Sequence, residues 1–203
     1  ATAGEEMSKY VKDFKKPIVV SCDATTASAA YEIASQANYI YTAKTSSVGS
    51  IGVALQLTDL SGLYRMLGIN IENITSSDST DSTYGNRPLT EDERAWYQSI
   101  VNQINDVFIA TVAEGRNLSE SQLRQLANGL AYTGMDAVNC GLCDEIGYLQ
   151  DAVSKASKLS GSDKALQTTT LTLPTASSLS SLIDVLGESG DDAALRALIE
   201  TYG

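Results

Sequence analysis

Ser28 occupies the position in this chain that best suits a nucleophile. It lies in Asp23-Ala-Thr-Thr-Ala-Ser-Ala-Ala-Tyr31, between an apolar run (residues 17–22) and an alanine-rich run (residues 29–37). The first run predicts a buried strand and the second predicts a helix. A turn between them would expose the hydroxyl, and the helix N-terminus would offer backbone N–H groups to a developing oxyanion. The alternative is that Ser28 only caps the helix.

The base that would activate this serine cannot be a histidine. The chain has no histidine, so neither a Ser-His-Asp triad nor a Cys-His dyad can form within it. A serine nucleophile would therefore need a lysine, a carboxylate or a group from another chain as its base.

Two cysteines have the CxxC spacing of a redox or metal site, in Cys140-Gly-Leu-Cys143. Cys22 is the only further cysteine, so a four-ligand zinc site of cysteine and histidine cannot be completed within the chain. The motif also falls at Gly141, where a helix is expected to end. We therefore expect a structural role for it, and no metal or organic cofactor.

Composition limits the class of protein. The 203 residues include 43% hydrophobic residues, which is typical of a folded domain, and the net charge is −11. This acidity argues against a nucleic-acid binder and against a protein that lies on an anionic membrane. No apolar run approaches the roughly 20 residues that span a bilayer. Because residues 1–6 resemble neither an initiator segment nor a signal peptide, we expect a piece of something longer.

The order of helix and strand patterns predicts an α/β domain with a parallel sheet. Helices are expected near residues 7–14, 29–37, 58–68, 90–114, 119–127, 133–140 and 150–159, and strands near 17–22, 39–42, 69–74 and 146–149. Thr90-Glu-Asp-Glu93 and Ser119-Glu-Ser-Gln122 are capping boxes that open two of the helices. The polar residues 75–88 predict a long loop that is functional or disordered.

Two parts are expected along the chain: a domain over residues 1–159, and a Ser/Thr-rich linker with a C-terminal helical segment over residues 160–203. The linker is expected over residues 160–181. Within the second part, the patterns allow a strand at 168–173 and short helices near 178–187 and 191–202.

Six motifs are specific as an ordered set, although each is weak alone. They are Ala27-Ser-Ala-Ala-Tyr31, Gly49-Ser-Ile-Gly-Val53, Arg87-Pro-Leu-Thr-Glu-Asp-Glu93, Ala113-Glu-Gly-Arg116, Tyr132-Thr-Gly134 and Gly141-Leu-Cys-Asp-Glu-Ile-Gly147. Over about residues 5–155 the chain resembles the signal peptide peptidase A family of serine peptidases, which includes phage head proteases. The resemblance implies a ClpP/crotonase-type domain, an α/β fold built as a ββα superhelix.

The resemblance also implies roles for individual residues. Ser28 matches the nucleophile, the Ala29 N–H matches one oxyanion donor, and the segment containing Gly49, Ser50 and Ile51 would line the groove for a peptide substrate. Family members form ring or dome homo-oligomers. They are extracytoplasmic and tethered to the bacterial cell membrane, here through a segment absent from this chain.

Two departures from the family bear on activity. The family's general base is a lysine in a pattern like S-G-x-x-K-D, but Ser76-Ser-Asp-Ser-Thr-Asp81 stands here, so Thr80 occupies the lysine position. A threonine hydroxyl cannot accept the serine proton at neutral pH, and no lysine lies between Lys44 and Lys155. The family's Gly-Gly oxyanion turn would precede Ala1, so the first strands of the fold would be missing.

Three explanations of Thr80 stay open: a deliberate replacement of lysine, a natural non-catalytic relative, or a base from Lys44 or a neighbouring subunit. We expect a serine peptidase that uses a Ser/Lys dyad on remnant signal peptides or similar apolar peptides, impaired in this form. The main alternative is a non-catalytic peptide-binding relative. A crotonase-type acyl-CoA enzyme is a third reading, which would need a carboxylate beside the oxyanion turn.

Overall fold

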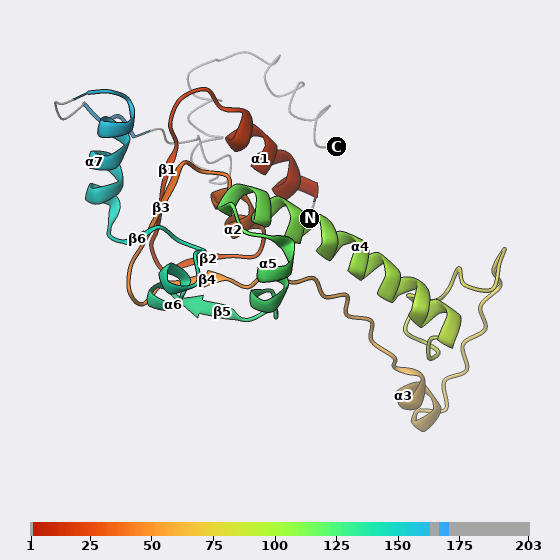
Figure 1. Cartoon of the computed structure of the whole chain (residues 1–203). Helices are drawn as coiled ribbons and strands as arrows, with labels where there is room; N and C mark the ends of the chain where they lie inside the picture. Colours follow the sequence, from red (N-terminus) through yellow and green to blue (C-terminus); the bar gives the residue numbers. More distant parts are fainter. Residues whose placement is uncertain (1, 163–166, 171–203) are drawn as a thin grey trace, which may run out of the picture. The chain divides into compact units, whose positions relative to one another are not determined.

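The computed structural model describes residues 2–162 and 167–170. Residues 2–162 belong to one compact unit that mixes helices with two three-stranded sheets (Figure 1). The first sheet is parallel, in the order β1 (Val19–Cys22), β3 (Tyr39–Thr42), β6 (Glu145–Ile146). The second has the order β2 (Thr25–Ala27), β4 (Ser47–Gly49), β5 (Ala131–Thr133); its first pair is parallel and its second antiparallel. The predicted α/β class is confirmed.

Seven helices surround or extend from the sheets in the described part of the chain. They are α1 (Thr2–Asp13), α2 (Ala29–Ala34), α3 (Ser61–Met66), α4 (Glu91–Arg116), α5 (Glu120–Leu126), α6 (Gly134–Asn139) and α7 (Leu149–Leu159). Helix α1 packs on α2, α7 packs on β1 and β3, and α6 packs on β5 (Figure 1). The connection from β2 into α2 is the turn that carries Ser28.

The hydrophobic core lies between the sheets, α2 and the C-terminal half of α4. Its largest fully buried side chains include those of Tyr31, Ile40, Ile51, Ile109, Leu123 and Leu142. Phe108 and Val112 extend this core along one face of α4. The N-terminal half of α4 lies outside it, and Trp96 is 66% exposed. The long apolar face of the predicted helix therefore packs in the core over only half its length.

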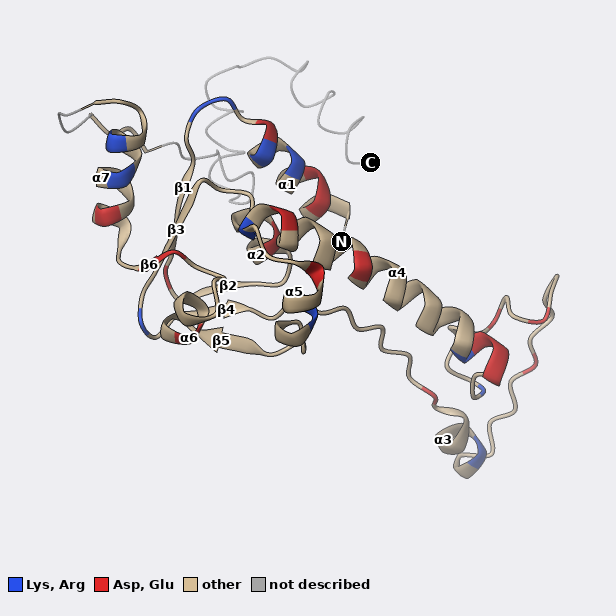
Figure 2. Cartoon of the chain, in the orientation of Figure 1, with Lys and Arg blue, Asp and Glu red and all other residues tan. Residues whose placement is uncertain are grey.

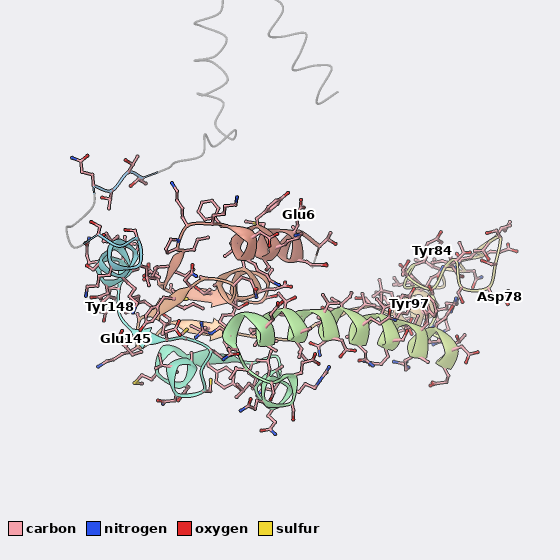
Figure 3. The ribbon with its side chains drawn as sticks, turned by 45° about the horizontal axis from the view of Figure 1, so that its top comes forward. Glu6, Asp78, Tyr84, Tyr97, Glu145 and Tyr148 are labelled. Atoms are coloured by element: carbon pink, nitrogen blue, oxygen red, sulfur yellow. The ribbon has the colours of Figure 1, made fainter. Side chains whose placement is uncertain are left out.

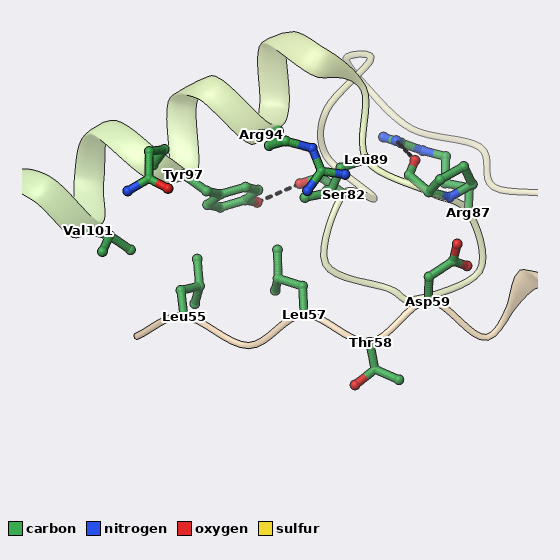
Figure 4. Close-up of a pocket in the computed structure, with 12 residues that line it drawn as sticks. Leu55, Leu57, Thr58, Asp59, Ser82, Arg87, Leu89, Arg94, Tyr97 and Val101 are labelled. Carbon is green, nitrogen blue, oxygen red and sulfur yellow. Dashed lines mark hydrogen bonds between the residues drawn. The ribbon is translucent and has the colours of Figure 1, made fainter. Parts of the chain in front are cut away.

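The other half of α4 is accompanied by residues 54–90, which we call the arm. Figure 1 shows the arm running along α4 away from the two sheets. Between Arg94 and Asp106 the helix carries no charged residue (Figure 2). Leu55 and Leu57 of the arm face this uncharged stretch across a cavity of about 300 Å³, where the Ser82 and Tyr97 hydroxyls lie 2.7 Å apart (Figure 4).

Local helix signals are the sequence predictions that the structure confirms most closely. Both capping boxes are formed, with the Thr90 hydroxyl accepting from the Glu93 N–H and the Ser119 hydroxyl accepting from the Gln122 N–H. The Thr133 side chain caps α6, which ends at Asn139 just before Gly141. Helix α1 begins five residues earlier than the 7–14 pattern indicated, and α2 and α3 are shorter than expected.

The predicted strand at residues 69–74 is wrong: this segment of the arm forms no strand. Its alternating pattern suits a strand edge, but in the described part of the chain no neighbouring strand pairs with it, and a strand needs such a partner to satisfy its backbone groups. Its apolar side chains remain exposed, Ile74 by 95%. The strands β2, β4 and β5 were not predicted, because each is only three residues long.

The structure tests only some of the predictions for the C-terminal part, because it describes few of these residues. Residues 167–170 form no strand, and residues 171–173, both late helices (178–187 and 191–202) and most of the 160–181 linker lie outside the described residues. The division at residue 159 stays a prediction, although α7 does end at Leu159.

Several of the family-like motifs prove to hold the scaffold together. Arg116 binds Asp144 through two hydrogen bonds of 2.7 and 3.1 Å, and the same carboxylate accepts from the Ile40 N–H of β3. A Cβ on Gly134 would overlap the carbonyl oxygen of Ala43, so only glycine allows α6 to start this close to the β3–β4 connection. These residues are explained by packing and need no role in chemistry.

Candidate active site

Ser28 stands in a backbone conformation that few residues other than glycine adopt. Its φ is 55° and its ψ is −130°, at the turn from β2 into α2. Such a conformation costs on the order of 1–3 kcal/mol and persists only where the surrounding structure enforces it. The hydroxyl makes no capping hydrogen bond to α2, and the residue is exposed. Helix capping therefore does not account for a serine at this turn.

Three neighbours enforce the turn. The Ser28 N–H donates to the Gly49 carbonyl at 2.8 Å, which ties the turn to β4. The Ser28 carbonyl accepts from the N–H groups of Tyr31 and Glu32, which starts α2. Tyr31 is fully buried, and its hydroxyl donates to the Leu142 carbonyl at 2.7 Å. The serine is thus presented by a helix that is anchored in the core.

A cavity of about 500 Å³ opens beside Ser28. Apolar residues of its lining come from the segment after β4 and from α4, and two acidic residues, Glu5 and Glu32, come from α1 and α2. The lining residues are Thr2, Glu5, Ser28, Ala29, Glu32, Gly52, Val53, Ala54, Ile104, Val107 and Phe108. The Ala29 N–H, the first of α2, has no hydrogen-bond acceptor among the described residues. A bound carbonyl could therefore receive that N–H while the hydroxyl lies next to its carbon.

The segment that follows β4 is shaped by two successive residues in the left-handed region. Gly49 has φ 91° and Ser50 has φ 48°. The Ser50 hydroxyl donates to the Gly129 carbonyl at 2.9 Å, and the Gly129 N–H donates back to the Ile51 carbonyl at 3.0 Å. Gly129 thereby holds Ser50 and Ile51 in place, while the preceding residue, Gly49, accepts the hydrogen bond from Ser28.

The predicted groove residues differ in what they can offer a peptide. Gly49 contacts the Ser28 backbone, and Ser50 lines a second cavity of about 490 Å³ beside Gly129. Ile51 is 1% exposed, so its side chain belongs to the core. The residues of this segment that line the Ser28 cavity are the next ones along the chain, Gly52 to Ala54.

Thr80 lies in the arm, in the loop of residues 75–88. It is exposed, and its hydroxyl lies 2.8 Å from that of Ser77. Asp78, two residues before it, lies with Tyr84 around the N-terminal end of α4, away from Glu6 of α1 (Figure 3). Neither Thr80 nor any other residue of that loop lines the Ser28 cavity.

The loop is tied to α4 by Arg87. Its guanidinium binds Glu93 through two hydrogen bonds of 2.7 and 2.9 Å and binds Asp81 at 2.6 Å. Glu93 also accepts from the Thr90 N–H as part of the capping box. These hydrogen bonds from Arg87 hold the pKa of Glu93 and of Asp81 below their usual values.

The Arg87 cluster should make the arm sensitive to acid. Both carboxylates have lowered pKa values in the folded state, so their contribution to stability is present above their ordinary pKa values of about 4 and is lost as the pH falls further. Hydrogen exchange of residues 75–94 should therefore accelerate between about pH 4 and pH 2 beyond the intrinsic trend. Arg87→Met should show fast exchange already at pH 7 and little further change in acid, whereas an equal acid response in both proteins would contradict this account.

The length of α4 separates the two predicted members of the dyad. Phe108 lines the Ser28 cavity, whereas Glu93 holds the loop that carries Thr80. Fifteen residues of helix at 1.5 Å each put about 22 Å between these two positions. A general base must come within hydrogen-bond reach of the hydroxyl. Within one chain the structure does not bring Ser28 and position 80 together.

Lys44 does not take the place of the missing lysine in this structure. It is exposed in the connection that precedes β4, whereas Ser28 lies beside Gly49, the last residue of that strand. Lys44 does not line the Ser28 cavity.

The three cysteines are free thiols; Cys22 and Cys143 are buried, and Cys140 is the residue after α6. No group of three or more cysteine, aspartate or glutamate side chains suitable for a metal ion occurs among residues 2–162 and 167–170. Nor does the described part contain a helix with the length and apolar character needed to cross a membrane.

The α/β fold and the serine at its strand-to-helix turn fit the serine peptidase class. The model of peptidase family S49 matches residues 11–163. The chain belongs to this family, which is that of signal peptide peptidase A.

Individual relatives agree with the family assignment. "Putative protease MJ0651" of Methanocaldococcus jannaschii is 38% identical over 159 residues, which are 77% of this chain and 51% of that protein. Protease 4 of Haemophilus influenzae is 33% identical over 71% of this chain and 23% of its own length. The chloroplastic serine protease SPPA of Arabidopsis thaliana is 28% identical over 91% of this chain and 28% of its own length. The chain thus spans about half or less of the relatives it matches.

Sequence reasoning missed the acidic residues of the Ser28 cavity. Glu5 comes from α1 and Glu32 from α2, and only the packing of these two helices brings them together. The sequence offered one indication, since Glu32 is the only charged residue of the alanine-rich run over residues 29–37. Val107 and Phe108 of α4 also line this cavity. No local pattern predicts this, because they lie about 80 residues after Ser28 in the chain.

Proposed function

We propose that this chain is the catalytic-type domain of a Ser/Lys serine peptidase with the ClpP/crotonase-type ββα superhelix, and that this form lacks its base. The parent activity is hydrolysis of remnant signal peptides or similar apolar peptides. The observation that carries the proposal is the strained turn at Ser28. This turn exposes a hydroxyl that makes no capping hydrogen bond and that lies beside a cavity. Membership of family S49 supports the same reaction class.

The chemistry assigned to the site is acyl transfer. The Ser28 Oγ attacks the peptide carbonyl, and the Ala29 N–H stabilises the oxyanion that develops. The second donor would come from the family's glycine turn, which precedes the segment matched by α1. A lysine at position 80, with its pKa lowered by desolvation, would take the serine proton and pass it to the leaving amine. Thr80 cannot do this, so the present form binds peptide with little or no turnover.

We further infer that position 80 serves the Ser28 of a neighbouring copy in a homo-oligomeric ring or dome. The separation of about 22 Å along α4 supports this arrangement, because it keeps the two positions apart within one chain. The arm supports it as well. Its residues 69–74 have a strand pattern without a partner in the described chain, and Ile69, Ile71 and Ile74 are exposed by 46%, 47% and 95%. A second copy could pair with this segment and cover it.

In its longer form the protein would be extracytoplasmic and tethered to the bacterial cell membrane, as the family resemblance implies. The first strands of the superhelix would belong to the same longer form. Both statements rest on the resemblance and on the relatives, which are longer than this chain.

A non-catalytic peptide-binding protein is the second candidate. The observation that favours it is Thr80 itself: its hydroxyl pairs with that of Ser77, and no lysine occurs anywhere between Lys44 and Lys155. In this case the cavity beside Ser28 would bind peptide and the serine would be idle.

A crotonase-type acyl-CoA enzyme would need a carboxylate beside the oxyanion turn, and Glu32 lines the cavity there. However, both charged residues that line the cavity are acidic, and they would repel the phosphates of coenzyme A. Membership of a peptidase family argues in the same direction.

The proposed function is tested by placing a lysine, the general base of the family, at position 80. The full-length protein with Thr80→Lys should hydrolyse an unstructured apolar peptide about 10²–10⁴-fold faster than the unaltered protein, which is the range for a positioned general base. Initial rates by mass spectrometry measure this. Adding Ser28→Ala to Thr80→Lys should return the rate to that of the unaltered protein. If Thr80→Lys stays inactive while the peptide still binds, the non-catalytic candidate replaces the peptidase.

A further inference from the structure

The cavity beside Ser28 is lined by two chemically different sets of residues. Val53, Ile104, Val107 and Phe108, from the segment after β4 and from α4, are apolar, whereas Glu5 of α1 and Glu32 of α2 are acidic. No lysine or arginine is among the lining residues. An apolar peptide side chain would use the first set and leave the second unused.

Glu32 is the unusual member of this cavity. It is 5% exposed. Its backbone is bonded within the turn and α2, but no residue that the structure describes donates a hydrogen bond to its carboxylate or forms an ion pair with it. A largely buried carboxylate that receives no hydrogen bond is costly, so a group in that position calls for an explanation. Burial raises the pKa of the Glu32 carboxyl most strongly; the positive charge of the N-terminal amino group lowers it, and the negative charge of Glu5 raises it by less.

The position of this carboxyl is set by two packed helices. Gly4 of α1 lies so close that a Cβ there would be 2.9 Å from a Glu32 carboxylate oxygen and 3.0 Å from the Ala29 Cβ. Glu32 is therefore held beneath α1, four residues after Ser28 and on the same side of α2. Glu5 of α1 is exposed and lines the same cavity.

We propose that Glu32, aided by Glu5, forms a subsite for a lysine or arginine side chain of the peptide bound at Ser28. This inference rests on the proposed function and narrows its substrate class from apolar peptides to peptides with one basic residue near the reacting bond. The methylene stem of such a side chain lies against the apolar residues, and its cationic head reaches the carboxylates. A charge-assisted hydrogen bond then satisfies Glu32 in a site where little water competes.

The chemistry of the cavity favours this occupant over a free inorganic cation. An ion would use the two carboxylates but none of the apolar residues, whereas a long basic side chain uses both. Glu5, placed on the exposed side, adds attraction for the arriving cation.

The test compares peptides that differ at one residue. Fluorescence anisotropy measures the binding of labelled alanine-rich peptides to the full-length protein, with lysine, arginine or norleucine at each position in turn. Norleucine keeps the stem of lysine and lacks its charge. At one position, lysine and arginine should bind about tenfold more tightly than norleucine.

Variants identify the residue responsible. Glu32→Gln should bring the lysine and norleucine peptides to within about twofold of each other at that position, and Glu5→Gln should reduce the preference by a smaller factor. Glu6→Gln is the matched control: Glu6 is the neighbouring acid on α1, is exposed and does not line the Ser28 cavity. It should leave the preference unchanged.

The outcomes separate this inference from the proposed function. An equal gain from lysine at every position would reflect only the net charge of −11 and would overturn the subsite. A preference that persists in Glu32→Gln would overturn it too. If neutral peptides bind and lysine gives no gain, the subsite fails and peptide binding stands. If neither kind of peptide binds, the proposed function fails and this inference fails with it.

Discussion

A mixture of two inactive proteins should become active. The unaltered protein supplies Ser28 without a base, and the double variant Ser28→Ala, Thr80→Lys supplies a base without the nucleophile. If position 80 of one copy serves Ser28 of the next, mixed oligomers contain some complete sites. With equal amounts and random assembly, a head-to-tail ring should reach about one quarter of the Thr80→Lys rate.

The reason for expecting this result is the stiffness of α4. The helix joins the core at Phe108 to the arm at Glu93, and Arg87 fixes the Thr80 loop to that end. An unbroken helix does not fold back on itself to close about 22 Å. The measurement is peptide hydrolysis after the two proteins are unfolded together and refolded. A mixture that stays inactive, beside an active Thr80→Lys single variant, would show that both members of each site come from one chain.

Removal of the Tyr31 side chain should have the largest effect on stability among the residues near the site. Tyr31 is 0% exposed and its hydroxyl donates to the Leu142 carbonyl. Tyr31→Ala should lower the free energy of unfolding by about 4 kcal/mol, as for other buried aromatic residues. Tyr31→Phe should cost about 1–2 kcal/mol, because it leaves a buried carbonyl without its donor and keeps the ring.

Urea unfolding at pH 7 measures both effects. Tyr10→Ala is the control: Tyr10 is 66% exposed on α1 and its hydroxyl reaches only Glu6, so its loss should cost less than about 0.5 kcal/mol. Comparable losses from Tyr31→Ala and Tyr10→Ala would mean that Tyr31 does not anchor α2, and the account of the Ser28 turn would lose its support.

The features of this chain that depend on residues close together in the sequence could be predicted. The capping boxes at Thr90 and Ser119 place their own partners three residues away, so the starts of α4 and α5 were predictable to the residue. The serine turn was predictable in the same way, since strand, turn and helix adjoin. The left-handed conformation of Ser28 was not, because Gly49 of another strand enforces it through a hydrogen bond.

Features that depend on distant partners escaped prediction or were predicted wrongly. Residues 69–74 have the alternation of a strand, but alternation gives no information about whether a neighbouring strand exists. Glu32 is covered by α1, which approaches it closely at Gly4. The separation of Thr80 from Ser28 follows from the fact that only half of α4 enters the core. A pattern of apolar residues along the helix does not show that difference.

The most direct test of the central claim, that Ser28 is the nucleophile of this fold, is covalent labelling. The full-length protein with Thr80→Lys is incubated with a serine-directed fluorophosphonate, and digested protein is analysed by mass spectrometry. The Ser28 oxygen displaces fluoride from phosphorus, so one phosphonyl group should appear on the peptide that contains Ser28, and none should appear when Ser28→Ala is added. A folded protein that stays unlabelled, or carries the label on a different serine, would contradict the account.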